Sequence, residues 1–327
     1  MNRRLMTFLL CLVIGCSDAP RDNPLDPLSP SYAGEATVSG SVILKDQGIP
    51  ISLALIRILE EGIEVTSDST GHFSCRLHSL GQATLVCTKD NFTPDTQRVS
   101  LTAGGSQSVS FLLNGAPVVL AHTILTRKVD QYYPSPQYYV DVAAQVTDPN
   151  GITDLDSVSF VVSSLVYPMD YVPSVKQFQT RVFKYDIPTN TIEWLVGKAL
   201  SIVSTDRSGA RNTSEPFYVT RVIETGATPV YPSSLNSDTT NGTPLLRWVT
   251  PSVTFPFSYT LGISRLDAGT QTIVWAIADV NSLLNQYQYP ADGSVPPLDA
   301  GDYVWTVTVV DEFGNTCRSK ESFFVVR

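Results

Sequence analysis

Four Asp-x-x-Gly tetrads are the repeated feature of this sequence that is best suited to binding an ion. They begin at Asp68, Asp148, Asp206 and Asp311. Calcium takes about six to eight oxygen ligands, so converging carboxylates are its usual environment in proteins. The same tetrad is typical of a tight turn, in which the Asp side chain accepts hydrogen bonds from the turn backbone. Since one tetrad supplies too few oxygens for calcium, we favour the turn interpretation.

The tetrad at Asp148 differs from the others because two further carboxylates follow it closely. Asp154 and Asp156 lie within the next eight residues and could converge with Asp148 on one ion. The spacing does not follow that of an EF-hand loop, so these three residues form only a weak calcium candidate. We therefore expect no metal and no cofactor other than a covalent lipid.

Catalytic motifs are missing from the sequence. Histidine occurs only as His72, His78 and His122, and neither HExxH nor GxSxG is present. A hydrolase needs a base beside its nucleophile, and no such arrangement stands out. The chain is therefore not expected to be an enzyme, although two carboxylates of a glycosidase can lie far apart in sequence.

Tyrosine is abundant and gathers in two Pro-containing segments. Tyr132 and Tyr133 belong to the first, and Tyr167 and Tyr171 to the second. Exposed tyrosines offer a large contact area at low entropic cost, which suits binding to a glycan or a protein. The alternative is that these side chains cap the ends of folded domains.

The N-terminus carries a secretion signal. Arg3 and Arg4 precede an apolar run, Leu5–Ile14, that is shorter than the roughly 20 residues needed to span a bilayer. The run ends in Val13–Cys16, which resembles the lipobox of bacterial lipoproteins. The resemblance implies that residues 1–15 are a signal peptide and that Cys16 is acylated and anchors the chain to a membrane. An ordinary signal peptide that happens to contain this cysteine is the alternative.

The residue after the acylated cysteine indicates the destination. Lipoproteins that stay in the inner membrane carry Asp there, whereas this chain has Ser17 and has Asp only at Asp18. The resemblance therefore implies the outer membrane of the cell envelope. Residues 16–35 form a Pro-rich tether, which favours an extended spacer. Its prolines are Pro20, Pro24, Pro27 and Pro30.

The charge balance limits the partners of the chain. The net charge is −9 and only 16% of residues are charged. Nucleic-acid binding requires a basic face, and so does electrostatic docking on anionic lipid. We therefore expect no nucleic acid, and attachment to the membrane through the lipid anchor alone.

Alternation of apolar and polar residues with frequent turn signals predicts an all-β chain. Its length and strand spacing favour three consecutive small β-sandwich domains, over residues 36–114, 116–224 and 226–327. The first domain resembles carboxypeptidase regulatory-like domains, which are transthyretin-like sandwiches without catalytic residues. The segments that carry this resemblance are Gly40–Val42, Gly48–Ala54, Thr66–Phe73, Gly81–Cys87 and Val109–Leu113.

The second and third domains show weaker family features. Val140, Val142, Ala144 and Val146 share one strand face, and the second domain resembles immunoglobulin-like sandwiches of envelope proteins. The third resembles a fibronectin type III-like domain, on the basis of the segments Pro244–Trp248 and Leu298–Val310. That resemblance implies a buried Trp248 and a tyrosine corner at Tyr303. The spacing before Tyr303 is one residue shorter than usual, which leaves the hydrogen bond of the corner open.

Three cysteines remain in the mature chain. Cys75 and Cys87 flank the turn at Leu80-Gly81 almost symmetrically, which predicts a cross-strand contact and makes them candidates for a disulfide. Two buried thiols are the equal alternative. Cys317 is expected in a core.

These features together favour a non-enzymatic, membrane-anchored lipoprotein of the cell envelope. Its sandwich domains would present loops to an envelope protein or a glycan. A structural spacer in an envelope complex and a non-catalytic subunit of a hydrolase are the alternatives.

Replacing the acylated cysteine tests the anchor. Cys16→Ala removes the only acylation site, and we expect the protein to leave the membrane fraction, because acyl chains supply the binding free energy. Fractionation of cells followed by immunoblotting measures the shift, with Cys75→Ala as the matched control. A Cys16→Ala protein that stays fully in the membrane fraction would contradict the lipoprotein interpretation.

Overall fold

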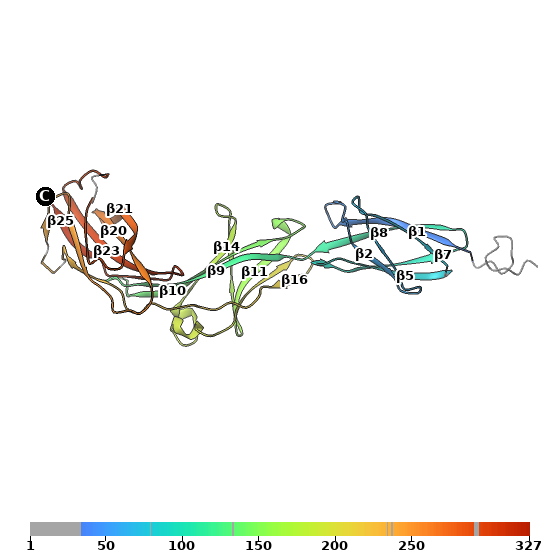
Figure 1. Cartoon of the computed structure of the whole chain (residues 1–327), viewed down its shortest axis with the longest axis horizontal. Helices are drawn as coiled ribbons and strands as arrows, with labels where there is room; N and C mark the ends of the chain where they lie inside the picture. Colours follow the sequence, from blue (N-terminus) through green and yellow to red (C-terminus); the bar gives the residue numbers. More distant parts are fainter. Residues whose placement is uncertain (1–33, 79, 133, 234, 237, 291–293) are drawn as a thin grey trace, which may run out of the picture. The chain divides into compact units, whose positions relative to one another are not determined.

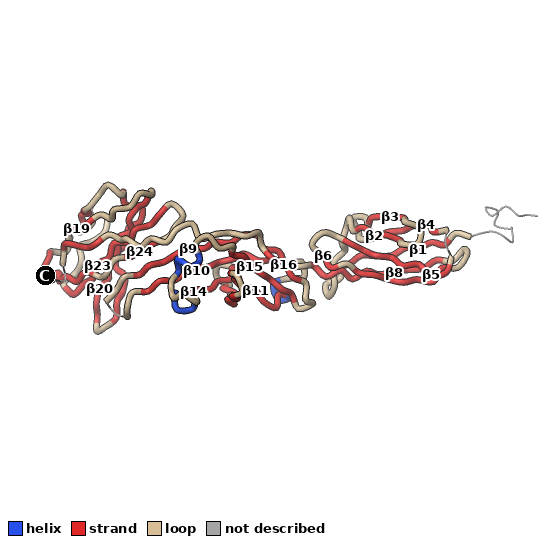
Figure 2. The backbone as a smooth tube through the Cα atoms, turned by 90° about the horizontal axis from the view of Figure 1, so that it is seen from below, coloured by secondary structure: helices blue, strands red, loops and turns tan. Residues whose placement is uncertain are grey.

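The computed structural model describes residues 34–327, apart from 79, 133, 234, 237 and 291–293 (Figure 1). The predicted signal peptide, Cys16, the tether up to residue 33, and Tyr133 lie outside the described residues. Strands and short 3-10 turns make up the regular structure of the described part, which confirms the all-β prediction (Figure 2). No helix in that part is long and apolar enough to cross a membrane. Two compact units divide the chain: one ends at Gly115 and the other spans Ala116–Arg327.

The first unit is a sandwich of two four-stranded sheets. One sheet has the order β4-β1-β8-β6 and comprises β4 (His72–Leu77), β1 (Ala36–Leu44), β8 (Ser106–Gly115) and β6 (Phe92–Thr93). The other has the order β3-β2-β5-β7 and comprises β3 (Ile63–Thr66), β2 (Leu55–Ile58), β5 (Gly81–Thr88) and β7 (Asp95–Leu101). Alternate residues of each strand point inward, as in Val38, Phe73, Leu85 and Phe111, and these fill one core.

Gly40 explains how β1 and β8 can pair closely. The two strands run parallel, with Gly40 opposite Val109. A Cβ atom at position 40 would lie 2.0 Å from the carbonyl oxygen of Val109, so any larger residue would force the strands apart.

The predicted cross-strand pairing of Cys75 with Cys87 is wrong. The segment at Leu80-Gly81 carries the chain from one sheet to the other, so β4 and β5 do not pair. Both cysteines are buried free thiols, which is the alternative that the sequence left open. Burial raises the pKa of Cys87 to about 12, so its thiol stays protonated at neutral pH.

The second unit begins with a sandwich around its own core. One of its sheets contains β13 (Asp170–Val172), β14 (Gln177–Phe183), β10 (Gln137–Thr147) and β9 (Val118–Val129). The facing sheet contains β12 (Leu165–Pro168), β11 (Leu155–Val162), β15 (Leu200–Asp206) and β16 (Arg211–Thr213). Three 3-10 turns link them: η1 (Ile152–Asp154), η2 (Lys184–Asp186) and η3 (Ile192–Leu195). The predicted inward face from Val140 to Val146 is buried, because β10 lies between β14 and β9 and packs on the facing sheet.

A third core follows in the same unit. Its main strands are β20 (Phe257–Asp267), β21 (Thr270–Asn281), β23 (Gly301–Asp311), β24 (Thr316–Arg318) and β25 (Ser322–Val326), with β18 (Thr239–Thr240) beside β25. A small sheet of β17 (Thr228–Tyr231), β19 (Leu245–Val249) and β22 (Gln286–Gln288) completes the sandwich. Trp248 and Cys317 are buried in this core, as expected, and so is Trp305. The tyrosine corner is also present, because the Tyr303 hydroxyl donates a hydrogen bond to the carbonyl oxygen of Asp299 at 2.9 Å.

The second and third sandwiches share one ten-stranded sheet. Its main path runs β13-β14-β10-β9-β24-β23-β20-β21. The join is a short parallel pairing between β9 and β24, in which Cys317 lies opposite Lys128 and Arg318 opposite Val129. Two cores with separate residues therefore lie along one hydrogen-bonded sheet.

The tyrosine corner generates a stability prediction. Tyr303→Phe keeps the buried ring and removes one hydrogen bond, so the free energy of unfolding should fall by about 1 kcal/mol. Urea unfolding followed by tryptophan fluorescence measures this change. Tyr287→Phe is the control, since Tyr287 lies in the same sandwich and packs beside Trp275. An equal loss in both variants would contradict a specific role for the corner.

Candidate functional site

Asn315 connects the second sandwich to the third where β9 meets β24. Its side chain is 1% exposed. The Oδ1 atom accepts a hydrogen bond from the backbone N–H of Thr126 at 2.9 Å. The Nδ2 atom donates to Asp311 Oδ2 and to Thr220 Oγ1, both at 3.0 Å. One amide thus satisfies buried polar groups from three separate segments.

The tetrad turn at Asp311 holds Asn315 in position. Asp311 Oδ1 accepts hydrogen bonds from the backbone N–H groups of Phe313 and Asn315. Arg221 completes the network, because its Nη1 lies 2.9 Å from Asp311 Oδ2 and 3.0 Å from Glu312 Oε2. The Asp311 side chain is fully buried, so this guanidinium supplies the charge that its carboxylate requires. The hydrogen bond from Arg221 also lowers the pKa of Glu312.

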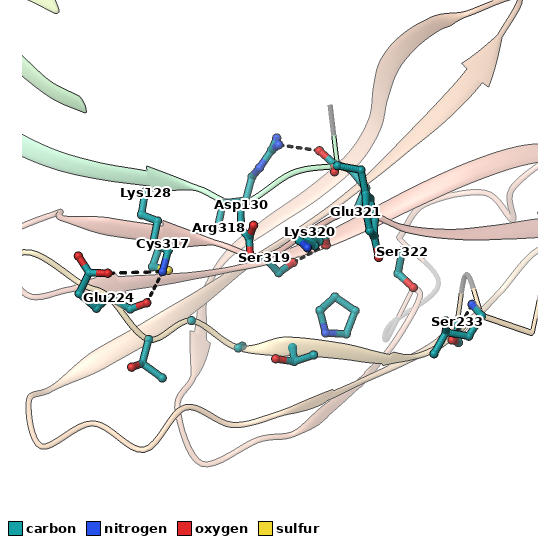
Figure 3. A pocket seen from close by; sticks show the side chains of 17 residues that line it. Lys128, Asp130, Glu224, Ser233, Cys317, Arg318, Ser319, Lys320, Glu321 and Ser322 are labelled. Carbon is teal, nitrogen blue, oxygen red and sulfur yellow. Dashed lines mark hydrogen bonds and ion pairs between the residues drawn. The ribbon is translucent and has the colours of Figure 1, made fainter. Parts of the chain in front are cut away.

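A cavity of about 450 Å³ opens beside this junction (Figure 3). The end of β9, the segment 224–235 and the segment from β24 to β25 line it. Lys128 projects from β9, donates a hydrogen bond to the carbonyl oxygen of Glu224, and lies 3.6 Å from the Glu224 carboxylate. A second ion pair in the lining joins Arg318 to Glu321 at 2.6 Å. The groove is therefore lined by charged groups of both signs.

Tyr132 and Cys317 differ strongly in exposure within this groove. Tyr132 is 67% exposed, and the ammonium of Lys320 lies 4.9 Å from its ring centroid. Cys317 is buried, and burial raises the pKa of its thiol to about 11. Gly226 approaches it so closely that a Cβ there would lie 2.8 Å from the cysteine sulfur. Cys317 is thus a packing residue and not a nucleophile.

The other tyrosines of the predicted binding loops do not join this groove. Tyr167 on β12 stacks on Phe160, and its hydroxyl donates to the carbonyl oxygen of Asp186 at 3.0 Å. Tyr171 on β13 packs against Phe178. Among the described members of the predicted set, only Tyr132 lines the groove. A shared aromatic surface made by all four remains a prediction without support from the described residues.

All four tetrads form turns. In each, the glycine N–H donates to the carbonyl oxygen of the aspartate at about 3 Å. In each, an aspartate Oδ1 also accepts a hydrogen bond from the backbone of the turn, as the turn interpretation predicts.

The structure brings together two of the three residues of the calcium candidate set. Carboxylate oxygens of Asp148 and Asp154 lie within 4.8 Å of each other and of an oxygen of Asp206, which was not in the set. Asp156 is exposed on β11 and lies outside that group.

The residues of the junction were not predicted as functional. Arg221, Asn315 and Lys128 come from three distant segments, and each looks like an ordinary surface residue in the sequence. The only signal in the sequence was the tetrad at Asp311, which we interpreted as a turn and not as part of a site. Strand pairing brings these residues together, and no local pattern encodes that pairing.

The histidines do not form a catalytic arrangement. His72 and His78 are exposed. His122 stacks on Phe217 with ring centroids 4.0 Å apart, and burial lowers its pKa. It therefore stays neutral at physiological pH and serves as a packing group.

Comparison with known proteins identifies the first unit. Residues 37–114 match the family model of the Carboxypeptidase regulatory-like domain. The resemblance inferred from its motifs is thereby confirmed. The match covers less than half of the chain. Among curated proteins, none matches this chain.

Several solved structures resemble the chain distantly. BcpA, the major pilin subunit of Bacillus cereus, is 12% identical, with a TM-score of 0.31 over 90% of this chain and 95% of that one. The fibronectin(III)-like modules of Clostridium thermocellum CbhA are 12% identical, with a TM-score of 0.28 over 64% of this chain and 94% of theirs. A DUF3823 family protein from Parabacteroides merdae is 15% identical, with a TM-score of 0.26 over 57% of this chain and 99% of that one. At such low sequence identities and TM-scores, the likeness supports no conclusion about function.

Removing the Asn315 side chain tests the junction. Asn315→Ala leaves the buried N–H of Thr126 without its acceptor, so the free energy of unfolding of the second unit should fall by about 2 kcal/mol. Chemical unfolding of the purified protein measures the loss. Asn212→Ala, on the partly exposed edge strand β16, is the control and should change stability by less than about 0.5 kcal/mol. Equal effects of the two variants would contradict the role of Asn315.

Proposed function

We propose that this chain is a non-catalytic lipoprotein of the bacterial outer membrane that binds a segment of another envelope protein in the groove beside β24. The observation that carries this proposal is the position of the groove. Its walls include the two strands that join the sandwiches, and the network of Asn315 and Arg221 fixes those strands. A binding surface that is held in place before binding loses less entropy when the partner docks.

The chemistry of the groove favours a polypeptide over a glycan. Its charged groups have both signs, and they include the ion pairs Lys128–Glu224 and Arg318–Glu321. Glycan binding usually relies on an open aromatic face, whereas the ring of Tyr132 is partly covered by the ammonium of Lys320. A peptide segment with alternating charges and backbone hydrogen bonds complements such a surface better.

The residues with catalytic potential support a non-enzymatic role. The buried thiols have pKa values raised to about 12 at Cys87 and about 11 at Cys317, so neither is a thiolate at neutral pH. Asp148 and Asp206 converge, but both are buried, at 9% and 2% exposed, and offer no access to a sugar substrate. The proposed location rests on the N-terminal sequence alone, through Cys16 and Ser17.

A structural spacer is the second candidate function. The shared ten-stranded sheet favours it, because a continuous hydrogen-bonded sheet resists bending between the two sandwiches better than a flexible linker does. In this role the chain would hold a fixed distance within an envelope complex, and the groove would have no occupant.

Site-directed photo-crosslinking in intact cells separates these functions. A photo-reactive phenylalanine analogue at Tyr132 should give one discrete adduct when the full-length protein is irradiated. The same analogue at Ile273, which is 73% exposed on β21, is the control and should give none. Lys320→Glu should reduce the Tyr132 adduct several-fold, because it reverses one charge of the groove.

The nature of the adduct decides between the alternatives. An adduct that proteinase digests supports the proposed protein partner. An adduct that only glycan-degrading enzymes remove would replace the protein partner by a glycan. Identical patterns at Tyr132 and Ile273 would contradict a binding groove and leave the spacer.

A further inference from the structure

Three aspartates meet at one end of the second sandwich, away from the groove. Asp148 directly follows β10, Asp154 ends the η1 turn before β11, and Asp206 ends β15. One carboxylate oxygen from each lies within 4.8 Å of the others. The antiparallel pairing of β11 with β15 places Leu155 opposite Asp206, and this register brings the ends of both strands to the same place.

Two of these carboxylates, those of Asp148 and Asp154, each have one buried oxygen without a hydrogen-bond partner. Asp148 is 9% exposed and Asp206 is 2% exposed. The Oδ2 atoms of Asp148 and Asp154 are both buried and accept no hydrogen bond. Among the residues that the structure describes, no basic side chain pairs with Asp148 or Asp154. Buried anions without a counter-charge are unfavourable, so the arrangement calls for a positive ligand.

The nearby backbone donors are already used. The N–H of Gly151 donates to the carbonyl oxygen of Asp148, that of Asp154 to Gly151, and that of Arg207 to Asp154. Only the N–H of Asn150 reaches the Asp148 side chain, at Oδ1 and 2.7 Å. The turn therefore orients the carboxylates while leaving the two Oδ2 atoms unoccupied by hydrogen bonds.

The closeness of the three carboxylates has an electrostatic consequence. Their oxygens lie within 4.8 Å of one another, so their negative charges repel. The cluster thus concentrates negative charge at a place shielded from water. A divalent cation would neutralise this charge.

We propose that Asp148, Asp154 and Asp206 bind a calcium ion that ties together the two sheets of the second sandwich. Asp148 belongs to the sheet of β9 and β10, whereas Asp154 and Asp206 flank strands of the facing sheet. All three side chains offer hard oxygen ligands, and the group contains no histidine or cysteine, which favours calcium over zinc. The three carboxylates supply part of the coordination shell, and backbone carbonyls or water complete it.

This proposal departs from two sequence-based expectations. It adds an inorganic ligand where none was expected, and it replaces Asp156 by Asp206 as the third carboxylate. It does not depend on the proposed partner or on the membrane anchor, since every ligand belongs to one sandwich.

Calorimetric titration of the metal-free, full-length protein with calcium chloride tests the site. We expect one ion per chain with a Kd between about 0.1 and 1 mM, the range of extracellular calcium modules. The melting temperature should rise by several degrees at saturating calcium, because the ion binds only the folded form. Magnesium should produce a much smaller shift, since it requires a smaller and more regular oxygen shell.

Substitutions distinguish a calcium site from a merely structural cluster. Asp148→Asn and Asp206→Asn should each abolish calcium binding. Asp148→Asn should also raise the melting temperature of the metal-free protein, because it removes one buried negative charge; a purely structural aspartate would lower it. If either variant fails to fold, Asp154→Asn replaces it in the calcium titration, because Asp154 is the least buried of the three residues.

Two matched controls complete the experiment. Asp156→Asn removes the third residue of the original candidate set, and Asp68→Asn alters the same tetrad in the first unit, where Thr70 and His72 satisfy the carboxylate. Both should keep the full calcium response. Absence of calcium binding to the wild-type protein up to about ten times the expected Kd would overturn the proposal, as would a response that survives in Asp148→Asn.

Discussion

The pairing of β9 with β24 is the interaction on which the second unit depends. Only three residue pairs form this join, and such a short parallel pairing is weak by itself. Asn315 strengthens it by accepting the N–H of Thr126, and Arg221 makes it possible to bury the carboxylate of Asp311. The shared sheet, the groove and the position of Lys128 all follow from this join.

Features with a local period could be predicted from the sequence. The alternation from Val140 to Val146 and from Tyr303 to Val309 identifies buried strand faces, because each residue's direction depends only on its neighbours along the strand. The tyrosine corner is a case in which spacing alone was not decisive. The hydroxyl of Tyr303 reaches Asp299 even though the loop is one residue shorter than in the resembling family.

Features that depend on how strands pair could not be predicted. The symmetry of Cys75 and Cys87 about a turn suggested a hairpin, but the turn carries the chain between two sheets. The role of Asp206 depends on the register of β15 against β11, and the role of Asn315 depends on the pairing of β24 with β9. Each join connects segments that are separated by dozens of residues or more, and a single sequence holds no signal for such distances.

The bond between Thr126 and Asn315 links residues 189 positions apart in the chain. During synthesis, β9 therefore emerges long before the strand that will cover its outer edge. Until residues 316–318 arrive, the end of β9 is an open strand edge, able to pair with any other chain nearby. The C-terminal residues thus act as the closing step of assembly, and a chain that stopped before Thr316 would leave this edge open to aggregation.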